Sequence, residues 1–140
     1  MPSRAILALV LLASTCAPAL ADNFLVHIHS GPDNPTKAAL GFLVAATALD
    51  EGHDVDLFLA GDGASLITED ALSTVQGVGT GQLRDHFDTL IEGTATIYIS
   101  GKSAEARKIT EADLEGKSAQ FAMPAKLVEL AAAADVILVY

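Results

Sequence analysis

Apolar, β-rich segments alternate with segments of helical periodicity along most of this chain, and this alternation limits its fold more than any other feature. Continuous apolar runs predict buried strands at residues 24–30, 54–60, 94–100 and 136–140. Strands that alternate with helices and are apolar on both faces form parallel sheets covered on both sides. We therefore predict an α/β fold of three layers, α/β/α, with a mainly parallel sheet of four to five strands.

The connecting helices are predicted from the spacing of apolar residues. The first is expected over residues 35–51, with Asn34 as its N-cap, Pro35 at the first helical position and Gly52 at its end. The others are expected at 81–93, near 104–109 and at 124–134, with a short helix capped by Thr68. A polar stretch precedes the last helix.

The glycine-rich stretch "GVGTG" at 77–81 lies between two predicted helices. It lacks the spacing of the dinucleotide-binding fingerprint and does not follow a strand. We interpret it as a flexible linker.

Residues 1–21 predict a secretory signal peptide. Arg4 gives a positive start, Ala5–Ala13 is an apolar run without charge, and Ala19–Ala21 has the small-x-small cleavage pattern, with the cut expected before Asp22. A permanent membrane-spanning helix needs roughly 20 apolar residues, so we expect no membrane insertion after cleavage. Residues 22–140 are then one domain, periplasmic or secreted.

Two alternatives to this signal peptide remain open. The apolar run is also compatible with a first core helix of a cytosolic protein, although nothing polar marks one face of it. A lipoprotein cut before Cys16 is the other alternative, but Ala13–Thr15 matches the small-residue lipid-attachment pattern poorly.

Composition bounds the chemistry of the exported domain. The 140-residue chain is 51% hydrophobic, enough for one domain with a real core. Cleavage removes Cys16, the only cysteine, and Arg4, which leaves seven basic residues against 18 acidic ones, a net charge of −11. Such a domain has no disulfide and no thiolate, and its charge argues against binding nucleic acid or an anionic membrane.

Right-handed crossovers place all strand-to-helix loops at one edge of a parallel sheet, where ligands usually bind. The candidate ligand-binding residues at this edge are His29, Asp33, Asn34, Gly61, Asp62, Ser100, Ser103 and Arg107. Ser100, Ser103 and Arg107 could hold an anion at the start of a helix. Alternatively, Ser103 is a plain N-cap and Arg107 a solvated residue.

Two other chemistries have weaker support. His27 and His29 share a strand face and could bind a metal with Asp33 or Asp62, but such a pair is more often one hydrogen-bonded core histidine and one loop histidine. We expect no metal and no other cofactor.

The stretch "GASLI" around Ser65 begins like a nucleophile elbow but lacks its second glycine. The only histidine that follows it, His86, lies in a predicted surface helix. A catalytic triad is not expected.

Four stretches together resemble the DsrE/DsrF-like family, the small α/β subunits of sulfur-relay systems. They are "HSGPDNPTKAALGF", "EGHDVDLFLAGDGASL", "IYISGKSAEARKI" and "KLVELAAAADVILVY", in that order. Members that carry persulfide sulfur have a cysteine at the end of the third strand, often a second three residues later, and an arginine four further on. By this resemblance the cysteine positions are Ser100 and Ser103, and the arginine is Arg107. Lys108 replaces a glycine common in relatives.

A serine hydroxyl cannot hold a persulfide and is not a thiolate substitute without a nearby base. The resemblance thus implies an exported, non-enzymatic module that binds a small polar or anionic ligand or another protein, as a homo- or hetero-oligomer. Alternatively, the chain is the silent subunit of a sulfur-relay hetero-oligomer whose partner carries the cysteine. The apolar segment "VILVY" at 136–140 would leave an exposed edge unless a neighbour covers it.

Overall fold

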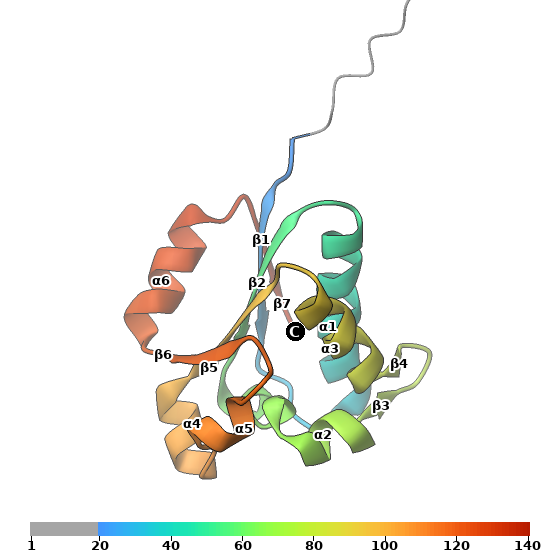
Figure 1. Cartoon of the computed structure of the whole chain (residues 1–140), viewed down its shortest axis with the longest axis vertical. Coiled ribbons are helices and arrows are strands. Elements are labelled where there is room, and N and C mark those ends of the chain that lie inside the picture. The colour runs from blue at the N-terminus through green and yellow to red at the C-terminus, as the bar shows by residue number, and fades with distance from the viewer. Residues whose placement is uncertain (1–19) are drawn as a thin grey trace, which may run out of the picture.

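A parallel sheet forms the centre of the molecule in a computed structural model, which describes residues 20–140. Its five strands are β1 (Asn23–Ile28), β2 (Asp54–Leu59), β5 (Thr96–Ser100), β6 (Ala119–Ala122) and β7 (Val136–Val139). They lie in the order β6-β5-β2-β1-β7, and every neighbouring pair is parallel. The predicted three-layer α/β fold is confirmed (Figure 1).

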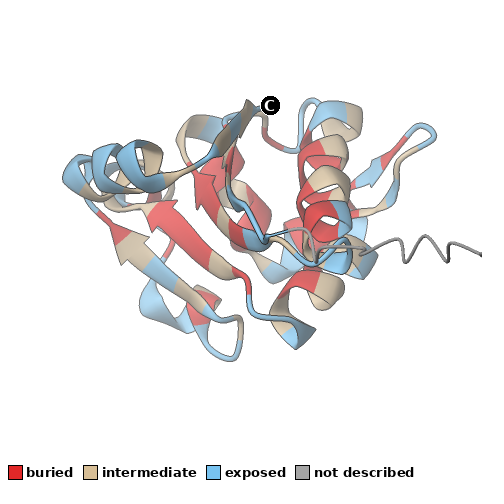
Figure 2. Cartoon of the chain, turned by 90° about the horizontal axis from the view of Figure 1, so that it is seen from above, coloured by how far each residue is buried: buried red, intermediate tan, exposed pale blue. Residues whose placement is uncertain are grey.

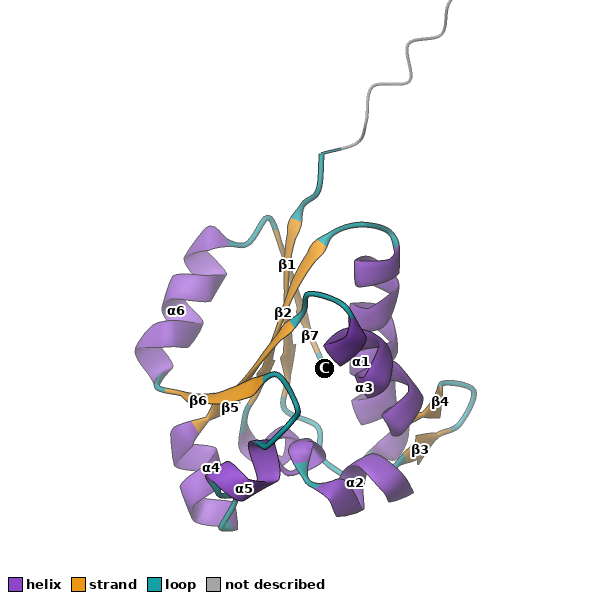
Figure 3. Ribbon diagram, in the orientation of Figure 1, coloured by secondary structure: helices purple, strands orange, loops and turns teal. Residues whose placement is uncertain are grey.

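Helices cover both faces of the sheet. They are α1 (Pro35–Asp50), α2 (Glu69–Thr74), α3 (Leu83–Glu92), α4 (Gly101–Arg107), α5 (Glu111–Leu114), α6 (Pro124–Ala133) and the 3₁₀ helix η1 (Gly61–Ile67). Figure 3 shows α1 and α3 on one side of the sheet and α6 on the other, with α2, α4 and α5 at the end where the strands finish. The strand-to-helix loops therefore meet at one edge, which we call the carboxyl edge.

The two faces of the sheet differ in how well they are covered. The larger core lies under α1 and α3, where Phe42, Leu57 and Leu90 are fully buried. The smaller core lies under α6 and contains Leu25 and Phe58, together with Tyr98 and Ala122. In α6 itself no residue is buried, as the absence of red on this helix in Figure 2 shows. One face is thus densely packed and the other only partly covered.

The first helix begins as its sequence predicts. The Asn34 side chain accepts a hydrogen bond from the Lys37 backbone N–H at 3.3 Å, and Pro35 occupies the first turn. Gly52 follows with φ +90°, a left-handed conformation that favours glycine. The predicted cap of α2 is also present, since Thr68 accepts from Ala71 N.

The interpretation of residues 77–81 as a flexible linker is wrong. The strands β3 (Gln76–Gly77) and β4 (Gly81–Gln82) form an antiparallel hairpin. Val78 N donates to Thr36 Oγ1 at 3.0 Å, and a Cβ on Gly77 would lie 3.0 Å from Thr36 Cα. The glycine is there because the hairpin backbone approaches α1 too closely for a side chain.

The polar stretch before the last helix also contains structure that the sequence did not indicate. The helix α5 begins with a capping box, in which Thr110 and Asp113 exchange side-chain to backbone hydrogen bonds. The edge strand β6 pairs with β5, turning Phe121 toward the larger core and leaving Gln120 exposed. Four residues of mixed polarity carry too weak an alternation to be recognised as a strand.

Candidate functional site

The loop after β2 and the start of α4 meet at the carboxyl edge. The Gly61 backbone N–H donates to Ser103 Oγ at 2.9 Å across 42 residues of sequence. This hydrogen bond brings together two of the loops from which the candidate residues were drawn. Ser103 is partly buried there.

The N-cap of α4 is Ser100. Its Oγ accepts from Ser103 N at 3.4 Å, and the helix begins at Gly101. The predicted start near residue 104, and the alternative in which Ser103 is the cap, are both wrong. The physical reason is that the Ser103 side chain faces η1 and is already bonded to Gly61.

Arg107 closes the site from the last turn of α4. Its guanidinium donates to Ser103 O at 3.3 Å and pairs with the Asp62 carboxylate at 2.5 Å. The Arg107 side chain is 29% exposed and that of Asp62 is 73% exposed. Arg107 is therefore held in place by Asp62 and is not simply a solvated residue.

The first loop contacts the second through its backbone. Gly63 N donates to His29 O at 2.9 Å, and a Cβ on Gly31 would lie 2.8 Å from Asp62 Cβ. The His29 ring is also close, with Nδ1 4.0 Å from where a Cβ on Gly61 would stand. His29 thus lies beside the loop that follows β2.

Asp33 and Asn34 lie apart from this group in their interactions. The Asn34 side chain caps α1, so its oxygen serves the helix start. Asp33 is exposed, and the hydrogen bonds and ion pairs described for residues 20–140 do not join it to another candidate residue.

The histidine pair lies on the sheet face that α6 only partly covers. The rings of His27 and His29 are 4.0 Å apart between centroids, and His27 stands edge-on to Phe58 at 5.5 Å. Burial, followed by the positive charge of His29, lowers the pKa of His27 from 6.5 to about 4. His27 is therefore neutral at pH 7. Its buried Nε2 atom lacks the hydrogen bond expected of a core histidine.

Metal and triad chemistry gain no support from these positions. In the described part of the chain, no three His, Cys, Asp or Glu side chains gather as metal ligands. Ser65 lies in η1, while His86 Nε2 contacts Thr80 O at 2.6 Å.

A polar group under α6 was missed by the sequence analysis. Burial raises the pKa of Asp56, and the Lys126 ammonium lies 5.5 Å from the centre of the Tyr98 ring. The signal available in the sequence was the acidic residue inside the apolar strand 54–60.

None of the candidate ligand-binding residues lines any of three pockets on the described surface. The nearest in sequence, lined by Gly101, Ala104, Glu105, Ile109 and Phe121, lies between α4 and β6. Ser103 and Arg107 instead contact η1, and the groups that the candidate site offers are two hydroxyls, a guanidinium and a carboxylate.

A parallel sheet with helices on both faces and its strand-to-helix loops at one edge defines a small three-layer α/β domain. The sequence matches the model of the DsrE/DsrF-like family over residues 22–140, and the chain belongs to that family. No curated protein matches the sequence.

A solved structure has the same fold. The YchN protein of E. coli superposes with a TM-score of 0.68 at 13% sequence identity, covering 86% of this chain and 100% of that one. Within residues 20–140 no helix has the length and apolar character needed to cross a membrane.

Proposed function

We propose that this protein is a non-enzymatic member of the DsrE/DsrF-like family that binds a small anionic or polar ligand at its carboxyl edge. The observation that carries the proposal is the exposed ion pair of Arg107 with Asp62 beside the hydroxyls of Ser100 and Ser103. Residues 22–140 contain no cysteine, so no thiol is present to carry sulfur covalently.

The ligand would compete with Asp62 for Arg107. A guanidinium binds carboxylate and oxyanion groups through paired N–H donors, so an anionic ligand can replace the Asp62 carboxylate. Displacement is easy because the Asp62 side chain is 73% exposed and an exposed ion pair contributes little. The Ser103 hydroxyl accepts from Gly61 and still has its own hydrogen to donate to the ligand.

Anion titration of three variants tests this competition. With sulfate and thiosulfate as probes in calorimetry, Asp62→Asn should strengthen binding by up to about fivefold, because the internal competitor is lost. Arg107→Gln should weaken binding by at least about tenfold. Asp85→Asn, on the exposed surface of α3, makes the same charge change elsewhere and is the control. Equal binding by all four proteins would refute the proposal.

A separate experiment tests the proposal that the protein is not an enzyme and carries no covalent sulfur. Wild-type protein incubated with sulfide or thiosulfate donors should gain no mass, whereas the double variant Ser100→Cys and Ser103→Cys supplies a thiol control. Covalent sulfur on the wild-type chain would show that the assignment is wrong.

A second candidate function is that of a silent subunit in a periplasmic sulfur-relay hetero-oligomer. It is supported by the missing cysteines together with exposed aliphatic side chains on α6 and β7, which suit a protein contact. Co-purification of a cysteine-bearing partner would favour it, and a homo-oligomer alone in native pull-downs would count against it.

Export is proposed on the sequence of residues 1–21. The structure describes residues only from Leu20 onward, so the signal segment lies almost wholly outside the described residues. The proposal rests on the positive start at Arg4, the apolar run Ala5–Ala13 and the small-x-small pattern at Ala19–Ala21. N-terminal sequencing of the exported protein would test the cut.

A further inference from the structure

A largely apolar groove runs along the second half of α1 toward the edge where the strands begin, which we call the amino edge. One wall consists of α1 side chains that lie on one side of the helix: Leu43, Val44, Thr47, Ala48 and Glu51. Phe24, near the start of β1, and His53, just before β2, form the other wall. The groove has a volume of about 420 Å³, and none of the candidate ligand-binding residues lines it.

Contacts within the fold hold the second wall of this groove in place. The Phe24 ring packs against the larger core and lies 4.8 Å from the His53 ring between centroids. The Asp22 backbone N–H donates to His53 Nδ1 at 3.1 Å, and this bond orients the imidazole. A groove that already has its shape loses little conformational freedom when a ligand enters.

The length of the groove matches a helical segment of another chain. Leu43 and Glu51 are eight residues apart on α1, which corresponds to about 12 Å, or roughly two helical turns. A partner helix that packs in a groove buries apolar side chains from successive turns, at positions i, i+3 or i+4, and i+7. The groove therefore has room along α1 for the apolar face of a short helix.

Four acidic residues lie at the amino-edge end of the groove: Asp22, Asp50, Glu51 and Asp54. Glu51 lines the groove, and the Asp22 carboxylate lies 3.8 Å from His53 Nδ1. The Asp54 backbone N–H donates to Asp22 O at 3.0 Å, which keeps these two residues together. The ion pairs described for residues 20–140 join none of the four carboxylates to a lysine or an arginine. The rim of the groove is therefore negatively charged.

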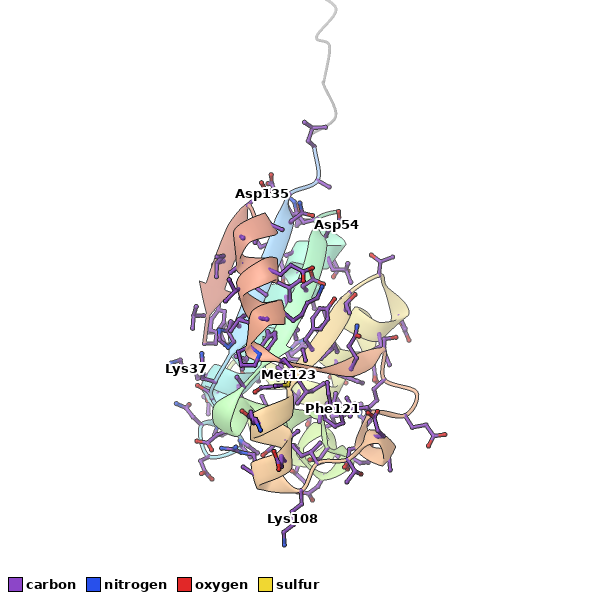
Figure 4. All side chains as sticks on the ribbon, turned by 90° about the vertical axis from the view of Figure 1, so that its left-hand side faces the viewer. Lys37, Asp54, Lys108, Phe121, Met123 and Asp135 are labelled. Atoms are coloured by element: carbon purple, nitrogen blue, oxygen red, sulfur yellow. The ribbon has the colours of Figure 1, made fainter. Side chains whose placement is uncertain are left out.

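The basic residues of the described chain lie elsewhere. The helices α1, α3 and α6 each precede a strand, so their first turns lie away from the amino edge. Six of the seven lysines and arginines in residues 20–140 belong to these first turns, to α4 and to the residue after it: Lys37, Arg84, Lys102, Arg107, Lys108 and Lys126. The seventh, Lys117, donates to Ile67 O. Figure 4 shows Asp54 and Asp135 at one end of the molecule and Lys108 at the other.

We infer that this groove, which we call the acidic groove, binds a cationic amphipathic helix of another protein. The apolar face of that helix packs against Leu43, Val44 and Phe24. Its lysine or arginine side chains lie at the rim, where the carboxylates of Glu51 and Asp22 accept their hydrogen bonds. The inference does not depend on ligand binding at the carboxyl edge.

Charge decides between this occupant and others. A second copy related by a two-fold axis would place the same carboxylates opposite each other, and like charges repel. An acidic peptide or an anionic membrane is repelled in the same way, because the chain has a net charge of −10. A basic segment is attracted to the rim before it makes contact, which speeds its association.

Fluorescence anisotropy with designed peptides tests the chemistry of the occupant. The probe is a fluorescein-labelled peptide of leucine and lysine, about 15 residues long, with its leucines on one helical face. It should bind the wild-type protein in the micromolar range. A scrambled peptide of the same composition, which has no apolar face, should bind at least about tenfold more weakly. A peptide with glutamate in place of lysine should not bind.

Three variants test the place of binding. Glu51→Lys should weaken binding of the leucine-lysine peptide by at least about fivefold, because it reverses a charge at the rim. Thr47→Arg should weaken it by at least about tenfold, because the longer, cationic side chain fills the groove. Glu105→Lys, 76% exposed on α4, makes the same charge change as Glu51→Lys and should bind within about twofold of wild type. Thr47 and Glu51 are also exposed, so the variants should fold.

A fluorophore in the groove gives a second measurement, because residues 22–140 contain no cysteine that would also be labelled. Bimane on Thr47→Cys should shift its emission to shorter wavelength when the leucine-lysine peptide binds. Bimane on Val78→Cys, on the hairpin and 87% exposed, should not respond.

Four results would overturn the inference. They are equal weakening by Glu51→Lys and Glu105→Lys, equal binding of the ordered and scrambled peptides, binding of the glutamate peptide, and a smaller molar mass of Thr47→Arg than of wild type in light scattering. The last result would assign the acidic groove to a second copy of the chain.

Discussion

The backbone N–H of Gly61 donates a hydrogen bond to Ser103 Oγ at 2.9 Å, which ties the loop after β2 to the first turn of α4. Ser103, at the position where the resemblance places the second cysteine that members often have, is thus part of the fold of the carboxyl edge. The Ser103 hydroxyl accepts the Gly61 N–H hydrogen bond, whereas a thiol sulfur is a weak acceptor.

Ser103→Ala should therefore lower the free energy of unfolding by about 1–2 kcal/mol, because the part-buried Gly61 N–H loses its acceptor. Ser103→Cys should fall between wild type and alanine. Urea unfolding followed by circular dichroism measures both. Ser73→Ala is a suitable control, since that exposed hydroxyl only donates to Asp70 O within α2. Equal losses at residues 73 and 103 would contradict the structural role of Ser103.

A second prediction concerns the packed hairpin. A Cβ on Gly77 would lie 1.8 Å from Thr80 Oγ1 and 3.1 Å from Ala39 Cβ. Gly77→Ala should cost about 1–3 kcal/mol in thermal or urea unfolding, because the Thr80 side chain must turn away and the hairpin must shift from α1. Val78→Ala at the neighbouring position, 87% exposed, should be nearly neutral. If both variants are neutral, the hairpin does not pack on α1 as described.

Much of the fold could be predicted because its signals are local. The apolar runs 54–60 and 136–140 are long and uninterrupted, and Asn34 followed by Pro35 is a strong helix start. Given parallel strands, chain topology alone places Gly61 and Ser103 at one edge.

The parts of the fold and of the candidate site that the sequence did not predict depend on contacts between residues far apart in the chain. Nothing near Arg107 in sequence indicates its pairing with Asp62, which is 45 residues away. Ser100 and Ser103 are equally good caps by composition, and only the bond to Gly61 decides between them. The strand β6 is four residues long, and its pairing with β5, not its own pattern, makes it a strand.

A third prediction concerns pH. Because burial lowers the pKa of His27 to about 4 in the folded protein, the unfolded chain binds this proton first, near its ordinary value of 6.5. The contribution of neutral His27 to stability is present above pH 6.5 and is lost progressively as the pH falls to about 4. Urea midpoints across this range should fall for wild type and fall less for His27→Asn.

The groups that face His27 affect this test in known directions. His29 contributes to the lowered pKa, while Phe58 cannot titrate. Asp56 on the same sheet face has a raised pKa, so it binds its proton more tightly when folded and adds stability as the pH falls. Asp56→Asn should therefore make the acid loss steeper. A midpoint profile unchanged by His27→Asn would show that His27 is not the group responsible.

The last prediction concerns Lys117, which joins the turn before β6 to η1 and α2 through a nearly buried side chain. Lys117 Nζ donates to Ile67 O at 2.8 Å, at the end of η1, and lies 3.9 Å from the Glu69 carboxylate of α2. The Lys117 side chain is 12% exposed and that of Glu69 is 70% exposed. The bond to the carbonyl is thus shielded from water, and the ion pair is not.

Lys117→Met keeps the length of the side chain and removes the donor, so it should lower the free energy of unfolding by about 1–2 kcal/mol. Glu69→Gln should have a smaller effect, because exposed ion pairs contribute little and Glu69 also contacts Arg84. Added salt should reduce the loss of unfolding free energy caused by Glu69→Gln and leave the loss caused by Lys117→Met almost unchanged. If the two variants are equally destabilised and equally sensitive to salt, the ammonium acts through its charge and not through the Ile67 carbonyl.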